Sequence, residues 1–257
     1  MMAGELVAEV VRSSEAGRPL RVILPCGPRG WYEPFTRLVN DRKVSLGHVE
    51  VFHMDECLDW QARPIPRTHP YNFQGFMERH FYDPIRPDLR VPQSNRRWLT
   101  PETLDAVAAD LAEHPADLAY GGWGQDGHIA YNQAWRHPFS PVTVDQLRQS
   151  TARIQDNNLD TIIALSHRTF GGAYQFVPPM SVTLGLKEIL SAGKVRLFSD
   201  TGAWKQTALR VALFSSVTPE YPITLLQEHP DALLTATYET AQHPISLNPE
   251  WDLGVGS

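Results

Sequence analysis

The sequence predicts a Rossmann-like, doubly wound α/β fold: a mostly parallel sheet with helices on both faces. Three observations support this prediction. Short β-branched runs alternate with stretches of helical periodicity, the alternation continues along most of the chain, and the composition can supply a large core. Of the 257 residues, 42% are hydrophobic and 10% are aromatic, which excludes a disordered chain and fits a large single domain.

The expected strands are runs rich in β-branched residues, and the expected helices carry apolar residues three or four positions apart. Leu6, Val7 and Val10, for example, share one face of a first helix that ends before Gly17. Strands are expected at 20–25, 48–53, 116–121, 194–199 and 232–237. Further helices are expected at 31–40, 71–82, 101–113, 180–190, 203–213 and 223–227.

Other segments lack such a pattern. Residues 58–70 are rich in proline and arginine, which predicts a surface loop. Residues 135–169 mix prolines, polar residues and both periodicities, so a flap over a site and an ordinary surface excursion both stay open. We expect a single domain over 1–240, followed by a polar, loosely held tail over 241–257.

Charge and composition exclude several classes of function. Lys and Arg total 23 against 29 Asp and Glu, and the net charge of −6 argues against a nucleic-acid partner. The chain shows no apolar leader and no apolar run of about 18 residues, so we expect a cytoplasmic protein without membrane contact. Cys26 and Cys57 cannot form a disulfide framework or a zinc site, and the ten His residues lack metal-ligand spacing. We therefore expect no metal and no cofactor.

Chemically distinctive residues follow three of the expected strands, and parallel strands bind ligands at their carboxyl ends. The first group is Gly27-Pro28-Arg29-Gly30, ahead of a helix. Its glycines let backbone N–H groups approach an anion, and Arg29 adds a forked cation suited to phosphate, sulfonate or carboxylate. A proline-containing turn with an exposed arginine is the alternative.

The second group is Asp55-Glu56. Adjacent side chains at a strand end point in opposite directions, so at most one carboxylate faces a pocket. A carboxylate in that place could move protons between substrate carbons. A solvated strand end is the alternative interpretation.

The third group runs from Gly122 through Gly124 to His128. Its G-x-G-x-x-G spacing matches a dinucleotide fingerprint, but a second strand ending in an acid about 20 residues later is missing. Asp126 and His128 are better explained as a site, because histidine exchanges protons near neutral pH and a carboxylate can orient or charge-stabilise it. Glycines for tight turns and a core histidine are the alternative.

Taken in order, these pieces resemble a known family. The matching stretches are Leu24-Pro25-x-Gly27, Val51-Phe52-x-Met54-Asp55-Glu56, His69-Pro70, Gly121-Gly122-x-Gly124-x-Asp126-Gly127-His128-Ile129-Ala130-Tyr131-Asn132, Val177-Pro178, Thr183-x-Gly185, Lys205 and Gln227-x-His229-Pro230. The sequence resembles the glucosamine-6-phosphate deaminase/isomerase family and, more distantly, the 6-phosphogluconolactonases.

The resemblance implies an aldose–ketose isomerisation of an amino sugar phosphate. The residue matching His128 assists ring opening, held by the one matching Asp126. The residue matching Asp55 moves a proton between C2 and C1, and ammonia leaves when the resulting imine is hydrolysed. The loop after the first strand, the lysine matching Lys205 and an arginine further along hold the phosphate.

Three departures from the family predict a changed substrate. Gln133 stands where members carry glutamate, so this position can orient a neighbour but carries no charge. The loop Gly27-Pro28-Arg29-Gly30 lacks the usual Ser or Thr after the first glycine. The family's arginine falls near Asn158, with Arg153 close by. We expect Gln133 to make the protein a poor glucosamine-6-phosphate deaminase.

Three functions stay open at this point. The leading one is an isomerase or deaminase acting on a phosphorylated or otherwise anionic sugar. The second is a lactone hydrolase in which His128 activates water and Arg29 with Lys205 binds the anion. The third is a sugar-phosphate-binding module without activity, against which Asp55, Asp126 and His128 together argue. Family members range from monomers to hexamers, so a homo-oligomer is possible.

Overall fold

A computed structural model describes residues 1–133, 139, 141–242 and 247–248, and its main element is a six-stranded sheet in which all neighbouring strands are parallel. In sheet order the strands are β4 (Arg96–Arg97), β2 (Val49–His53), β1 (Leu20–Leu24), β5 (Leu118–Gly121), β8 (Lys194–Ser199) and β9 (Ala232–Ala236). The expected α/β fold is confirmed. Of the expected tail, only 241–242 and 247–248 lie within the described residues.

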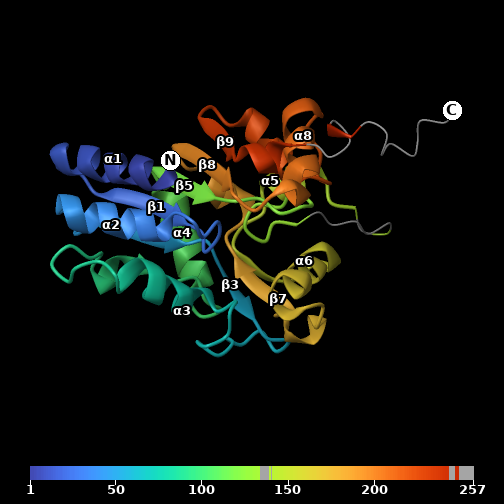
Figure 1. Ribbon diagram of the computed structural model, residues 1–257, viewed down its shortest axis with the longest axis horizontal. Helices are drawn as coiled ribbons and strands as arrows, with labels where there is room; N and C mark the ends of the chain where they lie inside the picture. Colours follow the sequence, from blue (N-terminus) through green and yellow to red (C-terminus); the bar gives the residue numbers. More distant parts are fainter. Residues whose placement is uncertain (134–138, 140, 243–246, 249–257) are drawn as a thin grey trace.

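Helices cover both faces of this sheet (Figure 1). The helices are α1 (Met2–Glu15), α2 (Tyr32–Arg42), α3 (Phe73–Met77), α4 (Leu104–Glu113), α5 (Val144–Arg148), α6 (Leu159–Phe170), α7 (Leu186–Leu190), α8 (Gln206–Phe214) and α9 (Tyr238–Ala241). A π-helical turn (Glu78–Tyr82) extends α3, and 3₁₀ turns span Gln93–Asn95, Tyr174–Phe176, Ala203–Lys205 and Pro222–Glu228.

The alternation of strand side chains explains the two helical layers. On β1, Val22 and Leu24 belong to a buried cluster with α1 and α2, whereas Ile23 belongs to a second cluster with α4, α7 and α8. On β5, Tyr120 joins the first cluster and Ala119 the second. Because successive side chains leave a strand on opposite faces, a strand buried on both faces carries a continuous apolar run, such as Val22-Ile23-Leu24 in β1.

A second sheet of three antiparallel strands was not expected from the sequence. It consists of β3 (Asp55–Leu58), β7 (Met180–Thr183) and β6 (Arg153–Asp156), and Figure 1 shows β3 and β7 beside each other. The residues after β2 therefore start a new strand, and the helix expected at 180–190 is wrong in its first part. The four residues of β7 are too few to distinguish a helical from a strand periodicity. This segment is a strand because it pairs with β3.

The segment over 135–169 proves to be mostly regular. Residues 134–138 and 140 lie outside the described part, and the rest contains α5, β6 and α6. Within the described residues, no helix is long and apolar enough to span a membrane.

Candidate active site

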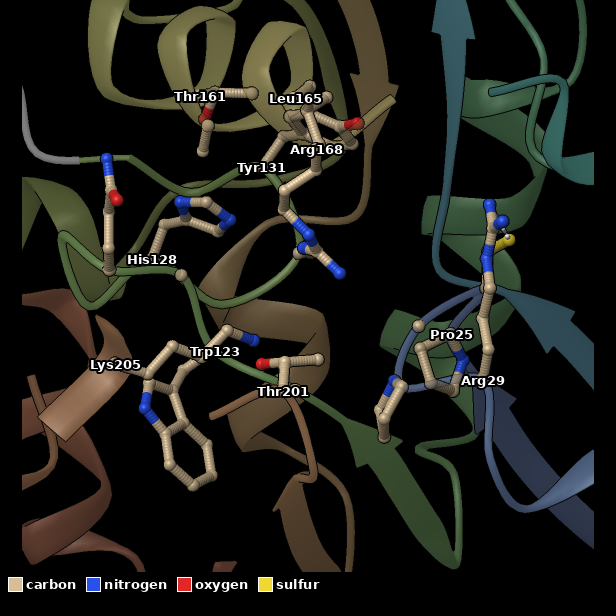
Figure 2. Close-up of a pocket in the computed structure, with 18 of the residues that line it drawn as sticks. Pro25, Arg29, Trp123, His128, Tyr131, Thr161, Leu165, Arg168, Thr201 and Lys205 are labelled. Carbon is tan, nitrogen blue, oxygen red and sulfur yellow. Dashed lines mark hydrogen bonds between the residues drawn. The ribbon is translucent and has the colours of Figure 1, made fainter. Parts of the chain in front are cut away.

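A cavity of about 400 Å³ opens at the carboxyl ends of β1, β5 and β8 and at the start of β3 (Figure 2). All the site residues expected from the sequence except Gln133 line it: Gly27, Arg29, Gly30, Asp55, Asp126, His128 and Lys205. The three strand ends therefore meet in one pocket, as expected for a parallel sheet. Helix α6 forms a further wall through Thr161, Leu165 and Arg168.

Two glycines allow the loops to come this close. A Cβ atom on Gly122 would lie 3.3 Å from both the Phe198 carbonyl oxygen and Pro28 Cδ, so this glycine lets the β5 loop pass between its neighbours. A Cβ atom on Gly124 would lie 2.2 Å from His128 Cε1 and 2.6 Å from Asp126 Oδ1. The glycine pattern thus serves the packing of a His–Asp pair.

His128 and Asp126 form a hydrogen-bonded pair in the cavity wall. Their Nδ1 and Oδ1 atoms lie 2.6 Å apart, and Asn158 Nδ2 donates to the other carboxylate oxygen at 2.8 Å. Burial opposes ionisation, but the charge of His128 and these hydrogen bonds hold the pKa of Asp126 well below its usual range. Since an ionised carboxylate only accepts, His128 Nδ1 carries a proton and Nε2 can exchange one with a ligand.

Asp55 is the first residue of β3 and faces the cavity, whereas Glu56 turns away from it. Burial, with a smaller contribution from the neighbouring Glu56, raises the pKa of Asp55 to about 8. The Glu56 carboxylate accepts hydrogen bonds from the backbone N–H groups of Phe73 and Gln74, both at 2.7 Å. In the described part of the chain nothing donates to the Asp55 carboxylate. This carboxylate is therefore a stronger base than usual and is available to a ligand.

Two cations converge from different elements at another part of the cavity. Lys205 precedes α8 and Arg168 lies in the last turn of α6, and Figure 2 shows both side chains directed into the space beside His128 and Thr201. Burial, followed by the charge of Arg168, lowers the pKa of Lys205 to about 8. The centroid of the Trp204 ring lies 5.0 Å from the Arg168 guanidinium carbon and 5.3 Å from Lys205 Nζ.

No described carboxylate forms an ion pair with Lys205 or Arg168, so the arrangement suits an anionic ligand. Arg168 was not among the site residues expected from the sequence. The helical spacing of Thr161, Leu165 and Arg168 is the signal that could have found it. Arg153, which was considered for the same task, donates to Asn132 Oδ1 at 2.9 Å and does not line the cavity.

Arg29 lines the cavity, but its guanidinium has protein partners. It stacks over the Phe76 ring, 4.3 Å from the centroid, and donates to the Pro70 carbonyl at 3.1 Å. Its neighbour Gly30 packs against Asp200, because a Cβ there would lie 2.6 Å from the Asp200 carboxylate. Figure 2 shows Arg29 away from Arg168 and Lys205, so the expected pairing of Arg29 with Lys205 is not seen.

No family model matches the chain, but curated relatives do. The glucosamine-6-phosphate deaminase of Parabacteroides distasonis is 33% identical over 239 residues, which cover 90% of this chain and 82% of the relative. The Porphyromonas gingivalis enzyme of the same name is 32% identical over 224 residues, with 85% and 79% covered. The chain belongs to the glucosamine-6-phosphate deaminase family. It is an enzyme of the deaminase/isomerase type, and the resemblance read from its motifs is confirmed.

Solved structures agree on the fold of this deaminase-family chain. A monomeric glucosamine-6-phosphate deaminase superimposes with a TM-score of 0.75 at 19% identity, covering 93% of this chain and 94% of the other. A 6-phosphogluconolactonase from Thermotoga maritima gives a TM-score of 0.61 at 14% identity, with 91% and 95% covered. At such identities these likenesses concern the fold alone.

Gln133, one of the departures from the deaminase family, lies outside the cavity. Its Oε1 atom accepts a hydrogen bond from the Asn158 backbone N–H, and its amide donates to the Tyr131 carbonyl at 3.3 Å. The side chain thus sits at the N-terminus of α6 and not against His128. Gln133 was expected to act on the catalytic residues as an uncharged orienting group, and its hydrogen-bond partners include Asn158 and Tyr131; its position among the motif residues does not show which way it points.

Proposed function

We propose that the protein isomerises a phosphorylated or otherwise anionic sugar by proton transfer between C2 and C1, and releases ammonia where C2 carries an amino group. One observation supports this most strongly. A carboxylate of raised pKa, a His–Asp pair and two cations without described carboxylate partners line a single cavity. Together these groups can supply the base, the proton shuttle and the anion site that carbon-acid chemistry on a small anionic substrate uses.

In this proposal His128 and Asp126 open the sugar ring. His128 Nε2 takes the proton of the C1 hydroxyl and delivers one to the ring oxygen as the bond from C1 to that oxygen breaks. Asp126 stays ionised and stabilises the imidazolium that forms between these transfers. The hydrogen bond of 2.6 Å between them keeps the imidazole in the required tautomer.

Asp55 then performs the isomerisation. Its carboxylate removes the C2 proton and returns it to C1. O1 gains a proton as the C2 hydroxyl or amine loses one, so the aldehyde carbon becomes an alcohol and C2 is oxidised in its place. An aldose phosphate gives a ketose phosphate. A 2-amino sugar gives an imine at C2, which water hydrolyses to the ketose and ammonia. The raised pKa of Asp55 suits a base that must take a proton from carbon.

Lys205 and Arg168 hold the anionic group in this scheme. Burial and the charge of Arg168 disfavour the protonated form of Lys205, and a bound dianion favours that form. Charge-assisted contacts to these two cations bind the substrate and place its C1–C2 end at Asp55 and His128.

Incubation with a panel of sugars, followed by NMR, tests the proposal. The panel holds aldose and 2-amino-aldose phosphates, the same sugars without phosphate, and a phosphorylated sugar lactone. We expect ketose signals from phosphorylated sugars and none from their neutral counterparts. Hydrolysis of the lactone alone would support a hydrolase instead, and binding without turnover of any member would support a binding module.

A further inference from the structure

Two residues with neutral amide side chains, Gln133 and Asn158, meet at the N-terminus of α6. The Asn158 backbone N–H donates to Gln133 Oε1. The two residues are 25 positions apart in the chain but lie at one place in the fold.

This amide pair reaches the catalytic histidine through one carboxylate. Asn158 Nδ2 donates to Asp126 Oδ2 at 2.8 Å, and Asp126 Oδ1 accepts from His128 Nδ1 at 2.6 Å. The other end of the Asn158 side chain is also held, since its Oδ1 accepts from the Thr161 backbone N–H at 2.9 Å. Asn158 therefore joins the helix start to the His–Asp pair by hydrogen bonds at both ends of its amide.

Gln133 contacts both Asn158 and Thr161 at the N-terminus of α6. Its side chain is 8% exposed, and its Oε1 also accepts from the Thr161 hydroxyl at 3.4 Å. The path from Gln133 to His128 runs through the Asn158 backbone and side chain and then through the Asp126 carboxylate, which accepts hydrogen bonds from Asn158 and His128.

We infer that Gln133 and Asn158 are positioning residues that align Asp126 and His128 and tie them to α6. The same helix carries Arg168, ten residues after Asn158, at the cationic part of the cavity. One rigid element therefore sets both the imidazole and a cation that contacts the substrate anion. The inference rests on the proposed function for its kinetic consequence, but its geometric content is independent of the substrate.

A purely structural role for Asn158 makes a different prediction. Asn158 is the N-cap of α6, and caps stabilise helices whatever lies beside them. Serine at this position keeps a side-chain oxygen for the Thr161 N–H but has no amide to donate to Asp126. Asn158→Ser therefore separates capping from positioning, and Asn158→Ala removes both.

A matched control is available at the preceding residue. Asn157 is buried and donates to the Pro178 carbonyl at 2.8 Å, with no contact to Asp126. Asn157→Ala should lower thermal stability but leave the His128 geometry unchanged. A comparison of adjacent asparagines thus separates a loss of stability from a loss of alignment.

The test measures two quantities in each full-length variant. The first is the NMR signal of the His128 Nδ1–H proton in ¹⁵N-histidine-labelled protein without substrate, and the second is kcat and KM on the substrate found with the panel above. For Asn158→Ser we expect near-normal thermal stability, a weakened Nδ1–H signal, a kcat lowered about 10- to 100-fold and a KM changed less than about twofold.

An unchanged His128 signal and unchanged kcat in Asn158→Ser, with losses only in Asn158→Ala, would overturn the inference in favour of simple capping. If no panel member is turned over, the proposed function fails. The NMR comparison of Asn158→Ser with Asn157→Ala still decides whether Asn158 aligns His128.

Discussion

The two parts of the cavity differ in how their charges are compensated. On the β5 loop, Asp126 accepts hydrogen bonds from His128 and Asn158 before any substrate arrives. Where α6 faces the start of α8, Arg168 and Lys205 contact an indole ring and no described carboxylate. The first part is preorganised for proton transfer, and the second is incomplete without an anion. Changes to the first part should therefore lower kcat, and changes to the second should raise KM.

Asp55→Asn should have the largest effect. The amide has the shape of the carboxylate but cannot accept a proton, so kcat should fall about 10²-fold or more while KM changes little. Steady-state kinetics near pH 8 measure this, and Glu56→Gln, whose side chain faces away from the cavity, should lower kcat far less than Asp55→Asn does. Near-normal turnover by Asp55→Asn would remove Asp55 from the mechanism.

Arg168→Ala should come next and should act mainly on KM. Loss of one charge-assisted contact at a partly solvated site should raise KM about 10-fold for a charged substrate and reduce its salt dependence. Arg29→Ala is the comparison, because the Arg29 guanidinium is already engaged by Phe76 and Pro70. We expect a smaller rise for Arg29→Ala. The reverse order would place the anion at the β1 loop.

The pH dependence of kcat/KM should show an optimum near pH 8. Asp55 acts as a base only when ionised, and its pKa of about 8 means that activity should rise about 10-fold per pH unit well below that value. Lys205 holds its charge below its own pKa of about 8, so anion binding should weaken above it.

Glu56→Gln removes a charge that contributes to the raised pKa of Asp55, so the acidic limb should move to lower pH. A profile that is flat between pH 6 and 8 would contradict these assignments.

Gln133→Glu should have the smallest effect, and in the opposite direction. A carboxylate at this position can accept the same Asn158 N–H bond, so alignment should persist, and its charge would support a protonated His128 during ring opening. We expect ammonia release from glucosamine 6-phosphate to be slow in the original protein and to increase a few-fold in the variant. Brisk release by the original protein, with no gain in Gln133→Glu, would restore an ordinary deaminase assignment.

The sequence predicted five of the six strands of the main sheet and the strand ends that line the cavity, because both depend on local patterns. The two-residue strand β4 was not expected. β-Branched runs identified β1 and β2, and the rule that parallel strands bind ligands at their carboxyl ends brought Asp55 and His128 together. The second sheet was missed because β7 pairs with β3, more than 100 residues away. Local patterns do not carry such long-range pairing.

Helix α6 was missed for a different reason. Its apolar residues Leu159 and Ile163 are 71% and 45% exposed, whereas Thr161 is buried and lines the cavity. Polar Thr161 and Arg168 line the cavity on this helix beside Leu165, while two of its apolar residues meet solvent, so the sequence lacks the single apolar stripe of an amphipathic helix. Arg168, on the cavity side of this helix, was therefore overlooked, and the direction of the Gln133 side chain could not be read from its place in the motif.

Hydrogen exchange at carbon tests the central claim most directly. The protein is incubated in D₂O with the phosphorylated sugar that the panel identifies, and deuterium at C1 of the ketose product is followed by NMR. With the original protein we predict solvent deuterium at C1, because the proton that Asp55 takes from C2 exchanges with water before Asp55 delivers it to C1. With Asp55→Asn we predict no label. Product formed at an undiminished rate by Asp55→Asn, with the same labelling, would contradict the account.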